Sequence, residues 1–565
     1  MAFFFLCIFR LNISNGAGVG MSRKSAGDKY DERRSQLLTA ERRLSSGNSE
    51  GVFETLVAFP REYAQAMGHL AFHRLYKQLS TWPDTLCSRA FMPEKDEFNW
   101  RNRQHKAIEA LDTGKSIKES DLLVFLMPSE TDWLPALQMM ELSDITLKNT
   151  QREHKWPILL ATGLSVTANP IPMSSFFDAF IIGETEPTLG PVLDIIKSLG
   201  SRRRPKSEIL AGLAMLPGLY VPTVHGINPK HSIMRQWASS ESVGALTDTI
   251  SAHTIMPDTY ILEIARGCPF NCRFCMSGYL LLPYREQRAE DLEYKIKQIP
   301  SGTTLIYAAC TPCGHDELPE LMELARECNL RARISSHMRE TPELAEELPT
   351  ILDAETLLLV PETGSESLRK VLGKLRTDES YFKLIREISP EMKRVQINLQ
   401  LGLPFENSSD LDANVEFMKT VKSLTKLPVV VRADQFIPRP WTAFQWSAMA
   451  NLRDVRENLA SLKSKLEKIG IKEVTGFDPR DTHIQALLIR GDVKVGKVIE
   501  KRLEGVGWNT AFEFAGLDMN TVFEEKDQSK QLPWEFLNMG FGYTRLAREF
   551  QMAQAAENER TGKDE

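Results

Sequence analysis

Three cysteines lie within eight positions of one another near the middle of this chain: Cys268, Cys272 and Cys275. An apolar run over residues 260–265 precedes them, and Gly, Pro and Asn residues break the pattern around them. We therefore expect the cysteines on a loop at the carboxyl end of a buried strand. A 4Fe-4S cube is usually held by four cysteine thiolates. Because this loop supplies three, one iron would stay open for a ligand that is not protein.

Two blander interpretations of the cysteines compete with the cluster. Inert cysteines usually lie in apolar surroundings, whereas this loop is polar. A structural zinc site is normally closed by four ligands. The loop holds no fourth Cys or His, and the nearest histidine before it is His253. The spacing therefore favours an iron–sulfur cluster with an open iron.

Length and composition limit the class of protein. The chain has 565 residues, too many for one core, and predicts about three domains or one large domain with extensions. Its hydrophobic content of 42% and charged content of 25% are typical of a soluble globular protein. The net charge of −6 gives no overall positive excess, so nucleic acid is a disfavoured partner.

The cysteines also indicate a compartment. Five of the eight lie in two short clusters, which is typical of metal binding in a reducing, cytoplasmic environment. The second cluster is Cys310 and Cys313, with Cys328 about one helix away. These three could ligate an auxiliary cluster or supply a redox-active thiol, but we favour a structural role.

The amino terminus begins with a short apolar stretch, MAFFFLCIF. It is too short for a bilayer, which needs about 20 such residues, and no other run is long enough for a membrane helix. We expect translation to start at Met21 and residues 1–50 to form a disordered leader or tail, with a weak signal anchor as the alternative.

A first series of short apolar strands alternates with helical stretches. The expected strands are 54–60, 86–93, 121–128, 156–163 and 178–184, with helices at 62–79, 134–142 and 187–199. This alternation predicts a parallel, Rossmann-like sheet over residues 51–200, whose ligands would bind at the carboxyl ends of the strands. No G-x-G-x-x-G follows these strands, so NAD and FAD are poorly supported.

A second series begins at the cysteine loop. Its expected strands are 260–266, 304–309, 331–336, 356–360, 395–401 and 429–436, with helices at 290–299, 317–328, 342–348, 365–372 and 411–421. Six strand–helix units predict a partial (β/α)6 barrel over 258–446, with the chemistry on the loops that follow the strands. Residues 201–257 would be a linker, and 447–565 a helical C-terminal extension.

The cysteine loop resembles that of the radical S-adenosylmethionine (SAM) superfamily. The pattern is C-x3-C-x2-C after a first strand, with Phe274 directly before the last cysteine. The resemblance implies a 4Fe-4S cluster whose open iron chelates SAM, and reductive cleavage of SAM to a 5′-deoxyadenosyl radical. It also implies an electron donor such as flavodoxin or ferredoxin.

The resemblance extends to later loops of the barrel. Gly314 and Glu317 stand where the family contacts the SAM amino group, and Ser336 is a polar group that could reach the ribose or carboxylate. The LGLPFE turn, with Leu403, resembles the turn that lies against the adenine.

The stretch PETGSESLRKVLGK resembles PEAGSExLRxxxNK of a cobalamin-linked subfamily. This implies that Glu362 contacts the ribose or SAM and that Gly364 permits a close backbone approach. Arg369 would pair with a carboxylate or be a surface helix residue. In FIPRPWTAFQW, Trp441 stands where the subfamily has a histidine.

The front sheet resembles the domain of cobalamin-binding radical SAM proteins. The segments GLSVTANPIP and FFDAFIIGETEPTL look like that class's GG-x-A-x-x-x-NP and FxDxxxxGEGE. The D-x-H-x-x-G motif, whose histidine ligates cobalt in many cobalamin domains, is absent from the sequence. Three interpretations of this sheet therefore stay open: it binds cobalamin without a protein histidine, it has lost the cofactor, or it is purely structural.

The sequence thus predicts an enzyme that functionalises an unactivated carbon through radical SAM chemistry. Bound cobalamin would point to methyl transfer; without it, carbon–carbon coupling, rearrangement or sulfur insertion are the alternatives. An iron–sulfur electron carrier or redox sensor and a zinc-stabilised RNA-binding scaffold are the other classes considered. The sequence does not identify the substrate, the catalytic residues or the oligomeric state.

Overall fold

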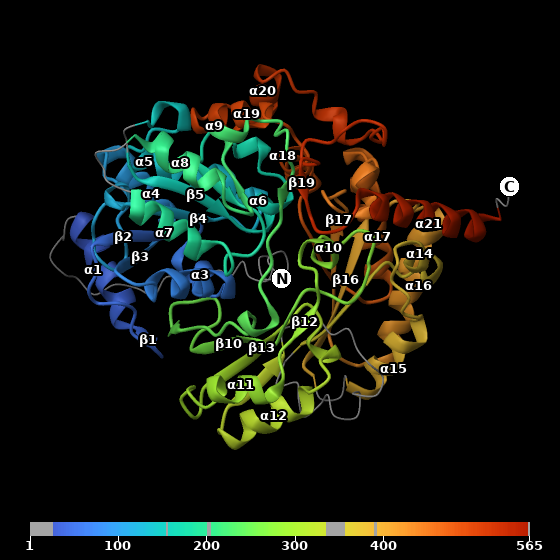
Figure 1. Ribbon diagram of the computed structural model, residues 1–565. Helices are drawn as coiled ribbons and strands as arrows, with labels where there is room; N and C mark the ends of the chain where they lie inside the picture. The colour runs from blue at the N-terminus through green and yellow to red at the C-terminus, as the bar shows by residue number, and fades with distance from the viewer. Residues whose placement is uncertain (1–25, 154–155, 200–204, 335–355, 389–391, 563–565) are drawn as a thin grey trace. The chain divides into compact units, whose positions relative to one another are not determined.

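A computed structural model describes residues 26–153, 156–199, 205–334, 356–388 and 392–562 (Figure 1). The chain forms two compact units. The first takes the residues up to Leu262 together with 298–303 and 496–506, and the second takes the remainder.

The first unit is built on a six-stranded sheet. Its strands are β2 (Phe53–Phe59), β3 (Thr85–Phe91), β4 (Leu122–Leu126), β5 (Ile158–Thr162), β6 (Ala179–Ile181) and β7 (Leu219–Tyr220). Their order is β3-β2-β4-β5-β6-β7, and only β7 pairs antiparallel. The predicted doubly wound sheet is confirmed, and the strand order reverses between β2 and β4, the place where such sheets bind ligands.

Helices cover this sheet because its strands are apolar on both faces. The longer ones are α3 (Leu70–Ser80), α5 (Trp133–Leu142), α7 (Leu189–Leu199) and α8 (Lys206–Ala214). Val57 and Phe59 of β2 pack into one core with α3, α7 and α8. The single helix predicted at 62–79 is wrong: it divides into α2 (Tyr63–Ala66) and α3. Between them Gly68 lies so close to Ile255 that a Cβ there would be 2.7 Å from its Cγ1.

Two segments expected outside the sheet domain carry regular structure within the first unit. Residues 26–50 contain α1 (Ala26–Thr39) and β1 (Glu41–Arg43), which pairs with β9 (Thr249–Ser251). Residues 201–257 contain α8, the edge strand β7 and α9 (Pro222–His225). The expected start at Met21 lies outside the described residues.

The first half of the barrel follows β10 (Thr259–Glu263). Its elements are β11 (Ala265–Arg266), α10 (Ser277–Leu280), β12 (Arg285–Glu286), α11 (Ala289–Ile296), β13 (Thr304–Ala308), α12 (Leu318–Glu327) and β14 (Arg331–Ile334). Strands β13 and β14 are parallel, and the amide of Ile264 donates to the Ala308 carbonyl at 3.0 Å. The cysteine loop therefore begins beside the ends of the first barrel strands.

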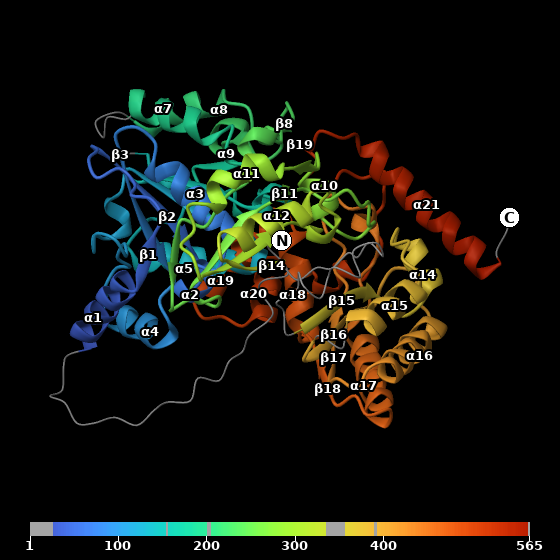
Figure 2. The same ribbon diagram turned by 90° about the horizontal axis from the view of Figure 1, so that it is seen from below.

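The second half of the barrel is a four-stranded parallel sheet. Its strands are β15 (Thr356–Glu362), β16 (Arg394–Leu401), β17 (Val429–Gln435) and β18 (Glu473–Thr475). Helices α15 (Asp378–Ile388), α16 (Ser408–Leu424) and α17 (Leu452–Lys468) lie along one side of it (Figure 2). The six predicted barrel strands are confirmed, β18 and α15 are additional, and the helix predicted at 342–348 lies outside the described residues.

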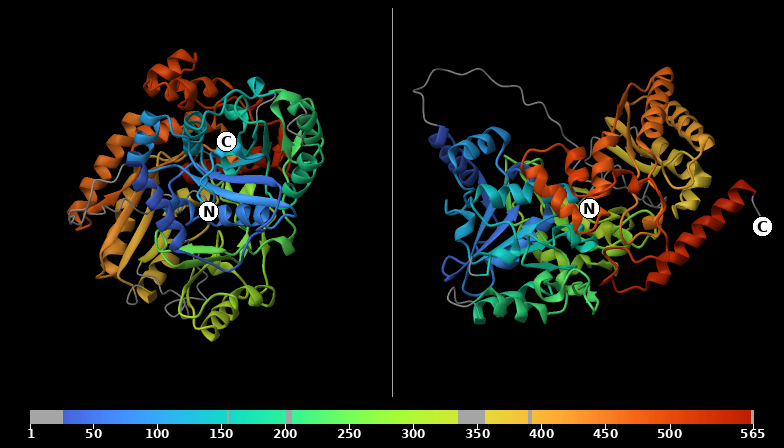
Figure 3. Two further views of the ribbon diagram at one scale, coloured as in Figure 1. Left: turned by 90° about the vertical axis from the view of Figure 1, so that its left-hand side faces the viewer. Right: turned by 90° about the horizontal axis from the view of Figure 1, so that it is seen from above.

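The C-terminal part is helical, as predicted. It contains α18 (Pro479–Ile489), α19 (Lys494–Leu503), α20 (Trp508–Phe514) and α21 (Tyr543–Thr561). Helix α21 packs against α14 (Glu366–Val371) and is the dark red helix before the C label in the right panel of Figure 3. Among the described residues, no helix is both long enough and apolar enough to cross a bilayer.

Candidate functional site

The cysteine loop is closed by a two-stranded ribbon. Strands β11 and β12 pair antiparallel, with Ala265 opposite Glu286. The two ends of the loop over residues 267–284 are therefore held side by side. Gly267 begins the excursion with φ +91°, and a Cβ there would lie 2.7 Å from the Leu281 carbonyl oxygen. Only glycine tolerates both the left-handed backbone and this close approach.

All three predicted ligands lie on this loop. Cys268 and Cys272 are buried, Cys275 is half-buried, and all three thiols are unbridged. The amide of Cys275 donates to the Cys272 carbonyl at 3.1 Å, a tight turn that carries the chain into α10. Within the described chain no three Cys, His, Asp or Glu side chains converge on a single-ion site. In a cube each thiolate binds its own iron, so this donor set fits a 4Fe-4S cluster.

Arg273, between two of the cysteines, anchors the loop to the end of α14. Its Nη1 donates to the carbonyls of Val371 at 2.8 Å and Lys370 at 3.2 Å, and its amide donates to the Leu372 carbonyl at 3.0 Å. A guanidinium at a helix C-terminus satisfies carbonyls that have no partner within the helix. The position of the loop is therefore set by a residue that is not a ligand.

The strand that enters the loop ends in a buried ion pair. The guanidinium of Arg266 donates to both carboxylate oxygens of Glu263, at 2.8 and 2.7 Å. Both side chains are buried, and the two-point geometry fixes them relative to each other.

The loop after β13 carries the predicted Gly314 and Glu317. One carboxylate oxygen of Glu317 accepts a hydrogen bond from the Ala289 amide at 2.6 Å, at the start of α11. Gly314 is exposed, and a Cβ there would meet only Thr311 Oγ1, at 4.0 Å. Glu317 thus caps a helix, whereas Gly314 has room beside it. The side chain of Cys313 and the predicted contact Ser336 lie outside what the structure describes.

Glu362 ends β15 in a strained conformation. Its φ is +70°, which is uncommon outside glycine, and the register with β16 shifts between Leu359 and Glu362. The buried carboxylate accepts from Nζ of Lys374 at 3.1 Å and from Nε2 of Gln400 at 2.7 Å. Strain at a barrel strand end is typical of a functional position.

The next two predicted residues hold the fold together. A Cβ on Gly364 would lie 2.6 Å from the Ala413 carbonyl oxygen, so the close backbone approach expected there is to helix α16. Arg369 is fully buried, so the surface interpretation is wrong. Its Nη1 donates to the Thr363 carbonyl at 2.8 Å and its Nε to the Arg376 carbonyl at 3.0 Å, while Nη2 pairs with Asp378.

The turn after β16 contains the buried Leu403 and an unusual carboxyl group. One oxygen of Glu406 accepts from the Gly402 amide at 2.7 Å, and the other has no partner among the described residues. Burial raises the pKa of Glu406 to about 8. The structure therefore keeps this carboxyl protonated near neutral pH.

The segments that resemble the cobalamin class build the strand ends of the first unit. Thr167 Oγ1 accepts from the Gly183 amide at 3.0 Å, Asn169 Oδ1 from the Ile171 amide at 3.2 Å, and Glu184 Oε2 from the Ala238 amide at 2.8 Å. These polar groups are satisfied inside the unit. None of the three side chains is a histidine, so cobalamin at these strand ends would be held without a protein histidine ligand.

The switch point of the sheet is bridged by an ion pair. Nε of Arg61, after β2, donates to Oδ1 of Asp132, after β4, at 2.6 Å. Burial raises the pKa of Asp132 to about 6. Close by in sequence, His69 is part-buried, its Nδ1 is enclosed without a hydrogen-bond partner within the described chain, and burial lowers the pKa of its imidazole to about 3. His69 is therefore neutral but enclosed.

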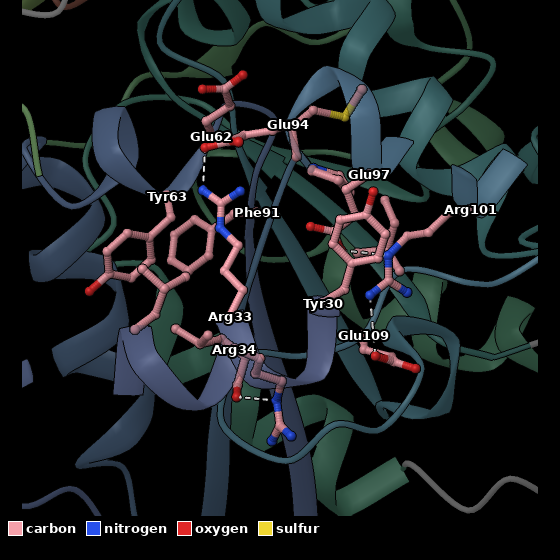
Figure 4. A pocket seen from close by; sticks show the side chains of 15 residues that line it. Tyr30, Arg33, Arg34, Glu62, Tyr63, Phe91, Glu94, Glu97, Arg101 and Glu109 are labelled. Atoms are coloured by element: carbon pink, nitrogen blue, oxygen red, sulfur yellow. Dashed lines mark hydrogen bonds and ion pairs between the residues drawn. The ribbon is translucent and has the colours of Figure 1, made fainter. Parts of the chain in front are cut away.

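A pocket with a cavity volume of about 90 Å³, partly open to solvent, lies between α1, the end of β3 and α4 (Lys95–Gln104) (Figure 4). Its arginines bind groups of the pocket itself. Arg33 pairs with Glu94, Nη2 of Arg101 lies 3.3 Å from Glu109, and Nε of Arg34 donates to the carbonyl of Leu111. These arginines are already paired with groups of the protein and are not available to bind a charged ligand. We therefore place the functional site on the cysteine loop.

Comparison with known families identifies the superfamily of the chain. The model described as the radical SAM superfamily matches residues 262–418, and the model of the N-terminal part of radical SAM proteins matches residues 71–222. Together they cover more than half of the chain, which belongs to the radical SAM superfamily and is an enzyme of that class. Membership implies a 4Fe-4S cluster and SAM.

Relatives share modest identity. An uncharacterised protein of Methanocaldococcus jannaschii is 23% identical over 79% of this chain and 90% of its own length. The tRNA-2-methylthio-N(6)-dimethylallyladenosine synthase of Geobacillus kaustophilus is 25% identical over 41% of this chain and 46% of its own. The bacteriochlorophyllide d C-8(2)-methyltransferase of Chlorobaculum tepidum is 22% identical over 46% and 56%. The last two matches span about half of each relative.

Among solved structures, the cobalamin-dependent radical enzyme OxsB with aqua-cobalamin bound covers 92% of this chain and 81% of its own, with a TM-score of 0.45 and 13% identity. The coproporphyrinogen III oxidase HemN of Escherichia coli covers 46% and 79%, with a TM-score of 0.29 and 11% identity.

Several residues that shape the site were not singled out from the sequence. Arg273 stands inside the cysteine motif, and its position between two ligands was a usable signal. Lys374 is the last residue of PETGSESLRKVLGK, and its match to the final lysine of the subfamily stretch was also a usable signal. Gln400 gave none, because its contact with Glu362 joins two different strands.

Proposed function

We propose that this chain binds a 4Fe-4S cluster through Cys268, Cys272 and Cys275 and functionalises an unactivated carbon of its substrate. When bound, a cluster with one open iron supplies the electron that cleaves SAM to methionine and a 5′-deoxyadenosyl radical. The observation that carries the proposal is the set of three unbridged thiols on one closed loop. A one-electron donor such as flavodoxin or ferredoxin would reduce the cluster.

The chain's own residues would order this chemistry. Gly267 and the ribbon of β11 and β12 fix where the loop begins and ends. Glu362 presents a carboxylate at the strand end where the ribose or SAM is expected, and Lys374 and Gln400 hold it there. Gly314 leaves room for a close backbone contact with the SAM amino group.

Methyl transfer with cobalamin is the leading reaction in this proposal. Its support is the resemblance of the front sheet and the name of the methyltransferase relative from Chlorobaculum tepidum. The alternative is radical chemistry without cobalamin, and the methylthio-forming relatives favour sulfur insertion within that group.

The test is anaerobic reconstitution with iron, sulfide and hydroxocobalamin, followed by desalting and metal analysis. About four irons per chain are expected, and near-stoichiometric cobalt would support methyl transfer. Four irons without cobalt would remove methyl transfer and leave the other radical reactions.

The matched control in that experiment is Cys87→Ala. Burial raises the pKa of the Cys87 thiol to about 12, so this cysteine is not poised to give a thiolate ligand. Replacing the three loop cysteines by alanine should abolish iron binding, whereas Cys87→Ala should retain it. If the variant without the three loop cysteines also retained its iron, the assignment of the ligands would be contradicted.

A further inference from the structure

We propose that the C-terminal helix α21 is a clamp that positions the cysteine loop before any cluster binds. The positioning residues are Glu549 and Arg545 on the helix, and Arg273 and Asn271 on the loop. The inference rests on the proposed function, because the loop is taken to be the cluster site. It gives the C-terminal extension a role that the family match at residues 262–418 does not cover.

The first contact joins the middle of the loop to the helix. Nε of Arg273 donates to Oε2 of Glu549 at 3.1 Å, and the two side chains are 9% and 21% exposed. Nη1 of the same guanidinium donates to the two carbonyls at the end of α14. Arg273 therefore ties the segment between two cysteine ligands to two helices at once.

The second contact lies just before Cys272. Nη2 of Arg545 donates to Oδ1 of Asn271 at 2.9 Å. The same guanidinium lies over the ring of Tyr279, 5.9 Å from its centroid, at the other end of the loop. Tyr279 also packs against Phe541, which precedes the helix, with ring centroids 6.0 Å apart. The helix thus reaches the loop on both sides of its last two cysteines.

The far end of α21 holds another loop of the barrel. Nη1 of Arg560 lies 2.6 Å from Asp410, and its Nη2 donates to the Phe405 carbonyl at 2.8 Å. Phe405 belongs to the turn after β16 that is expected to lie against the adenine of SAM. One rigid helix therefore spans the cysteine loop and that turn.

This arrangement reduces the cost of ordering the loop. Three thiols on a flexible loop would have to be gathered when the cluster binds, and that conformational entropy would weaken its retention. Residues that orient metal ligands without touching the metal commonly change affinity by 10- to 100-fold when removed. A clamp on Arg273 and Asn271 would act in this way.

The test uses full-length Glu549→Gln and Arg545→Gln proteins. After anaerobic reconstitution, iron loss to an excess of ferrous chelator is followed, and each variant should lose iron about tenfold faster than wild type. In cluster-free protein, backbone hydrogen exchange over residues 270–278 should also be faster. The thermal unfolding midpoint checks that the fold is intact.

The matched control is Glu559→Gln on the same helix. Glu559 is exposed and lies ten positions beyond Glu549, and this variant should behave as wild type in both measurements. Unchanged exchange and unchanged iron loss in Glu549→Gln and Arg545→Gln would overturn the clamp. If wild type bound no iron, the proposed function would fail, and exchange in cluster-free protein would still test the clamp.

Discussion

Nε of Arg273 and Oε2 of Glu549 lie 3.1 Å apart, although 276 residues separate them in the chain. Arg273 stands between Cys272 and Cys275, so helix α21 contacts the middle of the candidate cluster loop. The ends of that loop are fixed by the β11–β12 ribbon. The cysteine motif is therefore local in sequence, but its support comes from distant parts of the chain.

Lys374→Met should destabilise the protein. It would leave the Glu362 carboxylate buried with Gln400 but without its cationic partner. Removing one member of a buried pair typically costs about 3 kcal/mol or more. The control is Lys370→Met, because Lys370 is 62% exposed and lies 3.9 Å from Glu366. Urea unfolding measures both variants, and equal midpoints would contradict a structural role for Lys374.

Glycine substitutions should separate packing from ligand contact. Gly364→Ala places a Cβ 2.6 Å from the Ala413 carbonyl oxygen and should cost about 1–3 kcal/mol through overpacking. Gly314→Ala meets only Thr311 Oγ1 at 4.0 Å, so stability should be unchanged. If Gly314 contacts SAM, the KM of the Gly314→Ala enzyme for SAM should be higher than that of wild type. A stable Gly364→Ala protein would contradict the packing described here.

Arg369→Lys should lower stability and leave SAM binding unchanged. Lysine cannot replace a guanidinium whose three nitrogens all have protein partners, and the loss should be about 2 kcal/mol. Urea unfolding and SAM binding to the folded variant give the two readouts. Weaker SAM binding with unchanged stability would instead place Arg369 against the SAM carboxylate.

The raised pKa of Glu406 should make the stability of the protein depend on pH. Its folded pKa, about 8, lies above the ordinary value of 4.5, so the folded protein holds this proton more tightly than the unfolded chain. The stabilising contribution is fully present below about pH 4.5 and is lost as the pH rises to about 8.

Glu406→Gln should remove this part of the pH dependence. The free energy of unfolding of the variant, minus that of wild type, should be larger at about pH 8.5 than at about pH 5. Urea unfolding at both pH values measures this difference. Glu416→Gln, on the exposed face of α16, is the control. Parallel pH profiles for wild type and Glu406→Gln would show that Glu406 is ionised in the folded protein.

The sequence predicted the parts of the fold that depend on local pattern. Apolar runs bounded by turn residues placed the strands of both series, and the cysteine spacing placed the loop. The break between α2 and α3 depends on Gly68 packing against Ile255, which lies far away in sequence. Strand β18 is three residues long and only part-buried, too short to give a periodic signal.

The candidate site was predictable in its ligands but less so in its supporting residues. Arg369 and Gly364 belong to a family-like stretch, yet their roles depend on Asp378 and on helix α16. Glu317 stood in a loop expected to contact SAM, and the structure shows that one of its carboxylate oxygens caps α11. Such partners are fixed by tertiary packing, which one sequence does not reveal.

The most direct test of the central claim is formation of 5′-deoxyadenosine from SAM. The reconstituted protein is reduced anaerobically with dithionite, and the product is measured by chromatography. Wild type and Cys87→Ala should form it, whereas Cys268→Ala, Cys272→Ala and Cys275→Ala should not. A wild-type protein that carries its cluster but forms no 5′-deoxyadenosine would contradict the account and indicate an iron–sulfur electron carrier.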